Sequence, residues 1–316
     1  MTDIAPGFTN VSVIVAAYQA ADTIARTLAS ISGQTLKPKE VVVVDDGSTD
    51  GTFAAAELQA PNMNGIELRV FRTEENLGAG AARNRAIEEA TGAYLAFLDA
   101  DDEWLPKKLE RSLTHLDGSD FILVAHDYVT GEGEAAQHHD CVSRFQETSD
   151  PFIGLYRKGY IPSCSVVAER HAVINAGGFD PALRNAQDFD LWLAMLRQPG
   201  TPFLVFGEPL LCYHVSASGI MSHTDRRLEC CLKIARRYIP DLKQRSGAGV
   251  LDLWFRIAAL HIEAICAFGK RRAIPGLLLT MVKLPISLLT MTIFYFVGSP
   301  QPRGHFLATD ITLRDE

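Results

Sequence analysis

Residues 40–51 read Glu-Val-Val-Val-Val-Asp-Asp-Gly-Ser-Thr-Asp-Gly, a run of four valines that ends in a cluster of turn-forming residues. An unbroken apolar and β-branched run is typical of a strand buried on both faces of a sheet. Val11–Ala17 has the same character, and Ala93–Leu98 and Phe121–Ala125 add two further predicted strands. Strands of this kind are typical of a parallel sheet that is covered by helices.

Helical patterns separate these strands. Apolar residues at three- and four-residue spacing predict a helix that opens at Asp22, and similar patterns predict helices over Ala79–Ala90 and Pro106–Leu116. A shorter helix is expected from a cap at Asp50 through Leu58. We therefore expect an α/β fold, a mostly parallel sheet with helices on both faces and its ligand outside the carboxyl ends of the strands.

Weaker patterns extend the sheet on both sides. Gly131–Asp150 is polar and is predicted to be a loop or mobile flap, in which two adjacent histidines are solvated rather than metal-bound. Asp188–Arg197 is predicted to be a helix. Further strands are expected at Ile66–Phe71, Ile161–Ala168, Phe203–Phe206 and Leu210–Tyr213.

The composition is that of a folded globular protein. The 316 residues suggest about two domains, or one large domain with an appendage. Hydrophobic residues make up 47% and charged residues 22%, which excludes a disordered tail, a collagen-like rod and a multi-span transporter. Six cysteines are scattered without a CxxC pair, and Met1–Asn10 carries no signal-peptide pattern. We therefore expect reduced thiols in a cytoplasmic protein.

The charge is divided unevenly along the chain. Residues 226–283 carry a net charge of +8, so the remainder must carry −16 to give the total of −8. An acidic body with a basic C-terminal region suggests two roles on one chain and argues against a nucleic-acid partner.

The C-terminal region is predicted to be entirely helical. Leu228–Tyr238 and Val250–Phe268 have amphipathic spacing, and Ala273–Val297 contains one charge and two prolines. The prolines and the lysine favour a re-entrant or interfacial helix pair over an isolated span. Residues 226–297 are therefore expected to make peripheral or monotopic membrane contact. A helical cap, a homodimer interface and a true span are the alternatives.

Carboxylates recur at the predicted strand ends. Asp45 and Asp46 follow the second strand, and Asp99-Ala-Asp-Asp102 follows the fourth. Residues i and i+2 of an extended chain point the same way, so Asp99 and Asp101 can aim at one point. Such hard oxygen ligands suit Mg²⁺ or Mn²⁺ that bridges phosphates. Asp102 is instead expected to cap the helix that starts at Pro106.

A Gly-X-Gly sequence at Gly78–Gly80 allows a different reading, a nicotinamide-dependent oxidoreductase. Two details oppose it, because Arg83 stands at the third glycine position and the motif follows the third strand instead of the first. Arg83 near a helix start suits a phosphate group, to which the helix dipole also contributes.

Four ordered motifs carry a family resemblance. They are Val11-Ser-Val-Ile-Val-Ala-Ala-Tyr18, Val43-Val-Asp-Asp-Gly-Ser-Thr-Asp-Gly51, Asn76-x-Gly-x-Gly-x-Ala-Arg-Asn84 and Phe97-Leu-Asp-Ala-Asp-Asp102. From Val11 to Tyr213 the chain resembles the inverting, metal-dependent family 2 glycosyltransferases of the GT-A fold. The resemblance implies a nucleotide-binding half over 1–116 and an acceptor-binding half over 117–222, which together form a catalytic domain, followed by the helical region 223–316.

The resemblance also implies roles for individual residues. Asp46 would contact the uracil of a nucleotide-sugar. Asp99-Ala100-Asp101 would be the DxD motif, with Asp101 the main ligand of Mn²⁺ or Mg²⁺ and Asp99 close to the ribose or diphosphate. The other residues expected to bind the nucleotide-sugar are Ala17, Tyr18, Gly78 and Arg83.

A general base is implied further along the chain. Gln187-Asp188 matches the family's Glu-Asp position, so Asp188 would take the proton from the acceptor hydroxyl. Gln187 and Asp190 are candidates for contact with the acceptor. His214 stands near a position where the family frequently has arginine, and it either substitutes for that arginine or fills the core.

The residues and the resemblance together predict an inverting transfer of a hexose from a UDP-sugar to a saccharide acceptor. The basic, apolar C-terminal region favours a lipid-linked acceptor at the cytoplasmic face of the cell membrane, as in surface polysaccharide assembly. Besides the oxidoreductase, the alternative is a non-catalytic nucleotide-binding scaffold of the same fold.

Overall fold

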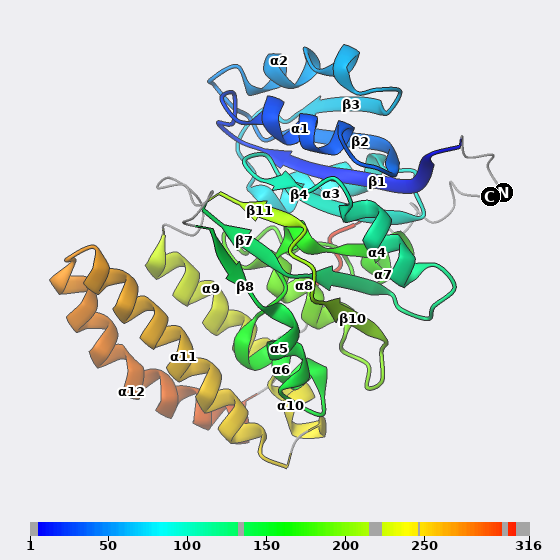
Figure 1. Ribbon diagram of the computed structural model, residues 1–316. Coiled ribbons are helices and arrows are strands. Elements are labelled where there is room, and N and C mark those ends of the chain that lie inside the picture. The colour runs from blue at the N-terminus through cyan, green and yellow to red at the C-terminus, as the bar shows by residue number, and fades with distance from the viewer. Residues whose placement is uncertain (1–5, 132–135, 215–222, 246, 299–302, 308–316) are drawn as a thin grey trace.

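A seven-stranded sheet forms the centre of the computed structural model, which describes residues 6–131, 136–214, 223–245, 247–298 and 303–307 (Figure 1). The strand order is β10-β6-β9-β4-β1-β2-β3, and every pair is parallel except those that β9 makes. The mostly parallel sheet is thus confirmed. The strands are β1 (Phe8–Ala17), β2 (Lys37–Asp45), β3 (Glu67–Arg72), β4 (Tyr94–Asp99), β6 (Leu123–His126), β9 (Val167–Glu169) and β10 (Phe203–Phe206).

Helices cover both faces of this sheet, and alternate strand residues point into two separate cores. In β1, Val13 and Val15 face the core beneath α1, α2 and α4, whereas Ile14 faces the core beneath α3 and α8. This alternation is what a strand buried on both faces requires. The helices are α1 (Ile24–Ser32), α2 (Thr52–Glu57), α3 (Ala79–Glu89), α4 (Lys108–Leu116), α5 (Cys141–Gln146), α6 (Pro151–Lys158), α7 (Arg170–Asn175) and α8 (Gln187–Met195), with 3₁₀ turns at Ala60–Asn62 and Ser163–Ser165.

A small second sheet lies across the carboxyl ends of the main strands. Its order is β5-β11-β7-β8, formed by β5 (Glu103–Trp104), β7 (Tyr128–Thr130), β8 (Gln137–His139) and β11 (Leu211–Tyr213). The prediction of a loop over 131–150 is wrong for its described part, which contains β8 and α5. Asp140 accepts a hydrogen bond from the Ser143 N–H and so caps α5, a local signal in a polar segment.

One strand is much shorter than predicted. The segment expected to be a strand over Ile161–Ala168 first forms the 3₁₀ turn and pairs only from Val167. Pro162 explains the difference, because the N–H of Ser165 and the hydroxyl of Ser165 both bond to its carbonyl oxygen. The turn places Cys164 under the end of β4, where it contributes to the site described below.

The C-terminal region is helical, as expected, and packs closely on the rest of the chain. It consists of α9 (Thr224–Arg237), α10 (Ile239–Arg245), α11 (Gly249–Lys270) and α12 (Ile274–Val297). Leu228, Ile234 and Leu253 belong to the same hydrophobic core as Phe97 and Trp192. Figure 1 shows α11 and α12 side by side on the outside of the molecule, at the opposite end from β2 and β3.

Residues 274–297 form one continuous helix, so the predicted helix pair within this segment is wrong. Pro275 lies in the first turn, where a missing N–H breaks no helical hydrogen bond. Pro285 lies inside the helix, which nevertheless continues to Val297. Among the described residues, α12 is the one helix long and apolar enough to cross a membrane, and 11% of its most apolar window is buried.

Ion pairs join the helical region to the rest of the protein. Arg245 of α10 binds Asp150 of the sheet domain, with Nη1 3.0 Å from Oδ2. The charges are reversed in a second pair, in which Arg197 Nε of the sheet domain lies 2.7 Å from Oδ1 of Asp241 in α10. Arg237 bridges two carboxylates described below. The uneven charge seen in the sequence is therefore partly neutralised within the molecule, between the helical region and the sheet domain.

Candidate active site

Three adjacent strands bring the predicted site residues together at one edge of the sheet. In the register of β1 with its neighbours, Ala17 lies opposite Asp45 of β2 and Ala16 lies opposite Asp99 of β4. The loops that follow β1, β2 and β4 therefore begin side by side at the carboxyl edge of the sheet. Tyr18 is exposed there, with 52% of its surface accessible, as a residue that contacts a ligand must be.

Asp46 holds the turn after β2 against the loop before α3. Its carboxylate accepts hydrogen bonds from the N–H groups of Leu77, over 2.9 Å, and Gly78, over 2.7 Å. Its own N–H donates to the Ala17 carbonyl. Gly78 has φ +97°, and a Cβ there would lie 2.7 Å from Arg184 Nη1, so this position requires glycine.

Arg83 points from α3 to the end of β4. Its Nη2 lies 2.5 Å from Asp99 Oδ1, and 7% of the Arg83 side chain is exposed, against 33% for Asp99. Burial opposes the charge of Arg83, but the charges of Asp99 and then Asp188 outweigh it and raise the pKa of the guanidinium. A cation fixed between the two carboxylates is thus available to a phosphate group.

Asp101 is the second residue of the predicted metal pair, and it is partly exposed beyond the end of β4. Burial and then the negative charge of Asp99 raise the pKa of the Asp101 carboxyl. The backbone around it is fixed by Thr23, which donates to the Ala100 carbonyl, and by Arg26, which donates to the Asp101 carbonyl. Two mutually repelling carboxylates that reach solvent suit a hard divalent cation such as Mg²⁺ or Mn²⁺.

Asp102 holds neighbouring segments together and does not cap α4 as predicted. It is fully buried, and it accepts hydrogen bonds from the His214 N–H over 2.8 Å and from the Cys164 thiol over 3.2 Å. The cap residue of α4 is Lys107, without a side-chain hydrogen bond, so the prediction that Asp102 caps this helix is wrong. Burial, followed by the charge of Asp99, raises the pKa of Asp102 to about 8.

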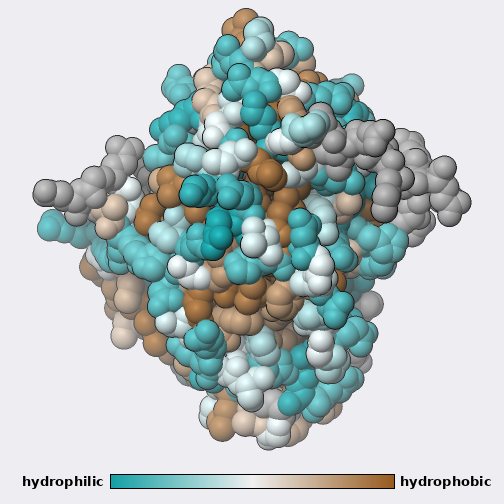
Figure 2. Space-filling view, turned by 45° about the vertical axis from the view of Figure 1, so that its right-hand side comes forward, coloured by the Kyte–Doolittle hydropathy of each residue, from teal (hydrophilic) through white to brown (hydrophobic). Residues whose placement is uncertain are grey.

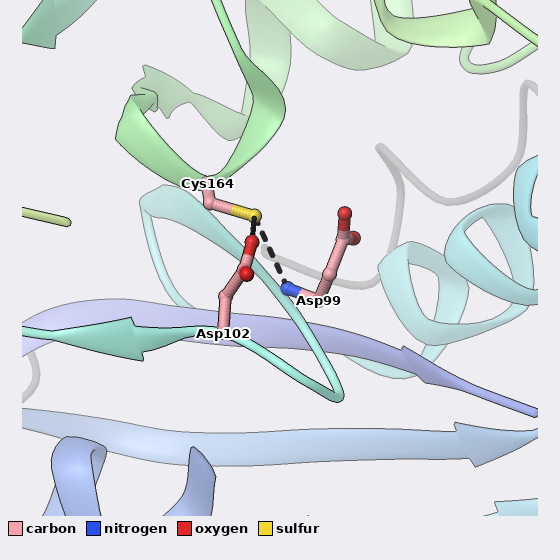
Figure 3. Close-up of side chains that lie close together, drawn as sticks. All are labelled: Asp99, Asp102 and Cys164. Carbon is pink, nitrogen blue, oxygen red and sulfur yellow. Dashed lines mark hydrogen bonds between the residues drawn. The ribbon is translucent and has the colours of Figure 1, made fainter. Parts of the chain in front are cut away.

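Cys164 completes this arrangement, and no motif or spacing in the sequence had singled it out. Its Sγ accepts a hydrogen bond from the Asp99 N–H and donates one to Asp102, whereas the Asp99 carboxylate points away from both (Figure 3). Ligand atoms of all three residues lie within 4.8 Å of one another. Because burial raises the pKa of the Cys164 thiol well above its ordinary value, the sulfur stays protonated and is a poor metal ligand. The Cys164–Asp102 pair therefore supports the end of β4 from below.

Asp188 lies in the first turn of α8, and its partner Ser163 directly precedes Cys164, which contacts Asp99. Ser163 donates a hydrogen bond to Asp188 Oδ2 over 3.2 Å, and the Phe189 N–H donates to Oδ1 over 2.8 Å. Ala186 starts the helix with φ +57°, and Gln187 is buried. Asp188 remains partly exposed, so its carboxylate can receive a proton from a bound group.

Asp190 has no access to a ligand. It is fully buried, and its two carboxylate oxygens accept from Arg237 Nη1 and Arg303 Nε, each over 2.7 Å. Arg237 also binds Asp180 Oδ2 over 2.7 Å. Arg303 donates in addition to the carbonyl groups of Ala176 and Gly178. Asp190 thus fastens α8 to the C-terminal region, which is a structural role.

His214 joins the small sheet to the loop that follows β4. Its Nε2 lies 2.9 Å from Glu103 Oε1, and Arg26 Nε lies 3.0 Å from the same oxygen. Together with the bond from its N–H to Asp102, these contacts place His214 beside Asp101, not in the hydrophobic core. The charge of His214 is one of the influences that lower the pKa of Asp101 against burial.

Comparison with known proteins gives one family. A family described as "Glycosyl transferase family 2" matches residues 12–174. The amylovoran biosynthesis glycosyltransferase AmsB of Erwinia amylovora is 30% identical over 271 residues, which cover 82% of this chain and 89% of AmsB. WfgD of Escherichia coli is 26% identical over 219 residues, covering 69% of this chain and 82% of WfgD, and is named a UDP-Glc:alpha-D-GlcNAc-diphosphoundecaprenol beta-1,3-glucosyltransferase.

Two solved structures share the architecture. S. aureus TarS 1–349 in complex with UDP-GlcNAc superposes with a TM-score of 0.58 at 21% identity, over 92% of each chain. A mannosyltransferase from Pyrobaculum calidifontis in complex with GDP-Man and Mn²⁺ gives a TM-score of 0.60 at 20% identity, over 91% of this chain and 87% of that one. The chain has the GT-A fold with an added helical region.

Proposed function

Because this chain belongs to glycosyl transferase family 2 and is a glycosyltransferase, we propose that it transfers a hexose from a UDP-sugar to a saccharide carried on a lipid diphosphate. The product would enter a cell-surface polysaccharide. The observation that carries the proposal is the convergence of Arg83, Asp99 and Asp188 at the carboxyl end of the sheet, where Asp188 and Asp99 bond to the adjacent residues Ser163 and Cys164.

The nucleotide-sugar is assigned to the half of the site formed by residues 1–116. Arg83 is buried, charged and directed at this edge, so it can bind the diphosphate of the donor. Tyr18 offers an exposed ring beside the turn that Asp46 holds. The UDP in the names of WfgD and of the TarS complex supports UDP as the nucleotide.

Asp188 is assigned the role of general base. It would remove the proton from the acceptor hydroxyl as that oxygen attacks the anomeric carbon, and Arg83 would stabilise the charge of the departing UDP. A single displacement of this kind inverts the anomeric centre. The hydrogen bonds from Ser163 and the Phe189 N–H fix the Asp188 carboxylate for this step.

Asp99 and Asp101 are assigned to a divalent cation, Mn²⁺ or Mg²⁺. Both carboxylates reach solvent and repel each other, which the cation would relieve. When bound, the cation supplies electrostatic stabilisation of the diphosphate leaving group.

The acceptor is assigned to residues 117–222, and its lipid to a membrane surface in contact with α11 and α12. Ten large apolar side chains of α12 are more than half exposed, among them Leu278, Val282 and Leu289. In Figure 2 apolar side chains are interspersed with hydrophilic ones and gather mainly across the middle and at the lower left of the view. Six free cysteines agree with a cytoplasmic location, at the inner face of the cell membrane.

The experiment is a panel of nucleotide-sugars titrated into the full chain by calorimetry, first with Mn²⁺ and then with EDTA. We expect one UDP-sugar to bind in a metal-dependent manner, and transfer to occur when a lipid-diphosphate saccharide is added. Binding of a nicotinamide cofactor without binding of any nucleotide-sugar would refute the proposal. Binding of a UDP-sugar without transfer to any saccharide would favour the non-catalytic scaffold.

A further inference from the structure

A pocket of about 210 Å³ lies between α9 and α11, outside the residues assigned above. Its lining is divided by chemistry. Thr224, Arg227 and Glu263 are polar, whereas Leu228, Leu260, Ala264 and Ala267 are apolar. The pocket is therefore suited to a ligand with one charged group and one hydrocarbon group.

The polar end carries two arginines. Arg227 lines the pocket, and Arg271 reaches it from the turn after α11, where its Nη1 donates to the Thr224 hydroxyl over 3.4 Å. Thr224 is also the first residue of a 14-residue helix whose cap residue makes no side-chain hydrogen bond. Two guanidinium groups beside a helix N-terminus favour a phosphate-bearing ligand.

One carboxylate at this end opposes an anion. Glu263 Oε2 lies 3.5 Å from Arg227 Nη2, a long contact between side chains that are 50% and 30% exposed. At such exposure the pair contributes little to stability, so a phosphate can replace the carboxylate on Arg227 at small cost.

The apolar end exists because two side chains are small. Ala264 and Ala267 are one helical turn apart on the face of α11 that meets α9, and larger residues would fill the space. Beyond the pocket, Ile262 of α11 and Ile274 and Leu278 of α12 are each more than half exposed. Apolar surface thus continues from the pocket along the outer helices.

Arg227 is also linked electrostatically to the assigned base. Burial opposes the charge of Arg227, but the groups around it, the carboxylates of Glu263 and Asp188 among them, raise the pKa of its guanidinium overall. Asp188 is thus one of the charges that act on a residue that lines the pocket.

We infer that this pocket binds the diphosphate of an isoprenoid-diphosphate acceptor, with Arg227 and Arg271 on the phosphate oxygens and the first isoprenoid units against Ala264 and Ala267. The inference rests on the proposed function and adds to it a specific anchor for the lipid. It orients the acceptor so that its saccharide extends toward Asp188 and its hydrocarbon chain toward α11 and α12.

The test uses farnesyl diphosphate as a short isoprenoid diphosphate, titrated into the full chain in EDTA so that no cation recruits a diphosphate to Asp99 and Asp101. We expect farnesyl diphosphate to bind and farnesol and inorganic pyrophosphate each to bind more weakly. Arg227→Gln should weaken binding about tenfold, because a charged hydrogen bond is lost. Ala267→Leu should abolish binding by filling the pocket, without any change of charge.

Two further variants separate a binding role from a structural one. Glu263→Gln should tighten farnesyl diphosphate binding several-fold, since it removes the competing carboxylate. If the Arg227–Glu263 pair were purely structural, Arg227→Gln and Glu263→Gln would both weaken farnesyl diphosphate binding. Arg226→Gln, an exposed neighbour outside the pocket lining, should leave binding unchanged. Thermal unfolding of each variant checks that it is folded.

Three outcomes would overturn the inference. The first is that farnesyl diphosphate does not bind to the wild-type chain. The second is that Arg227→Gln and Ala267→Leu bind farnesyl diphosphate as tightly as the wild type does. The third is that the protein binds phosphatidylglycerol vesicles but not farnesyl diphosphate. UDP-sugar binding with Mn²⁺ is measured on the same samples. If that binding is retained while farnesyl diphosphate fails, the pocket assignment alone is wrong, and if it is absent the proposed function fails first.

Discussion

Arg83 Nη2 lies 2.5 Å from Asp99 Oδ1, and the pair joins the first turns of α3 to the end of β4. The arginine is nearly buried and the aspartate is not, so the exposed carboxylate can rotate toward a cation while the guanidinium stays in place. Because the leaving group of a nucleotide-sugar carries negative charge, this fixed cation should contribute most in the transition state.

Replacing Arg83 with methionine should lower kcat/KM about 100- to 1,000-fold, since a preorganised donor to the leaving group is lost. Steady-state transfer assays with the UDP-sugar found in the calorimetric panel would measure this. Arg85→Met, at an exposed position two residues along α3, is the matched control and should change kcat/KM less than about twofold. Equal effects of the two variants would contradict the role of Arg83.

Asp188→Asn should reduce kcat about 100- to 10,000-fold and leave UDP-sugar affinity unchanged, because the amide keeps the shape of the side chain but accepts no proton. Calorimetry and transfer assays on one preparation give both numbers. Ser163→Ala, which removes one hydrogen bond to Asp188, should lower kcat far less. Unchanged transfer by Asp188→Asn would exclude it as the base.

Asp190→Asn should lower the free energy of unfolding by about 3–5 kcal/mol, because it leaves Arg237 and Arg303 without the charge that both of them bind in the interior. Urea denaturation measures the change. The exposed pair of Glu229 and Lys233 is the control, and Glu229→Gln should cost less than about 0.5 kcal/mol. A small loss in Asp190→Asn would show that the network is not needed for stability.

Stability should fall in acid because of His126. This side chain is fully buried, and burial, with a smaller contribution from the charge of Lys108, lowers its pKa from 6.5 to about 3. The unfolded chain therefore takes up a proton below pH 6.5 that the folded chain refuses until about pH 3, so stability falls as the pH drops through this window.

At pH 5 this one group should cost about 2 kcal/mol relative to pH 7. His126→Asn, which can still donate to the Asp127 carbonyl that His126 Nδ1 contacts, should reduce the difference between urea midpoints at the two pH values. The exposed His171→Asn variant should retain the wild-type difference. Identical acid sensitivity of His126→Asn and wild type would disprove the assignment.

Substituting serine at Leu278, Val282 and Leu289 together should lower co-sedimentation with phospholipid vesicles more than tenfold, because each apolar side chain contributes about 1.5–3 kcal/mol when buried. Leu58→Ser, on an exposed leucine at the opposite end of the molecule, should have no effect. Removing the whole C-terminal region is a poorer test, since α9 and α11 share a core with α8. Unaltered sedimentation of the triple variant would leave α12 as a packing or dimer surface.

The strand ends that form the site were predictable, because buried β-branched runs followed by aspartates make a local signal. The ends of β2 and β4 and the start of α8 are where the sequence placed them. The roles of Cys164 and Asp102 were not predictable. Each depends on a contact between segments about 60 residues apart, and a buried cysteine in an apolar segment looks like ordinary core.

The role of Asp190 was also not predictable from the sequence around it. Its position two residues after the expected base suggested contact with the acceptor, but both its partners come from the C-terminal region. Local spacing contains no information about such partners. Arg303 in particular lies 113 residues away, in a segment without any helical or strand pattern.

The attachment of residues 303–307 has a consequence for how α12 meets a bilayer. The Phe306 N–H bonds to the Gly177 carbonyl, Leu307 is buried and Arg303 binds Asp190, so the chain is anchored on the catalytic body after α12 as well as before it. Because both ends of α12 are held on the same body, the helix would lie parallel to a membrane surface. Only the side of α12 that faces away from the protein could then enter the lipid. Crossing the bilayer would require the Arg303 anchor to be pulled out, at the cost of a buried ion pair. In the proposed membrane contact, α12 would therefore lie along the lipid surface, at a depth set by these two attachments.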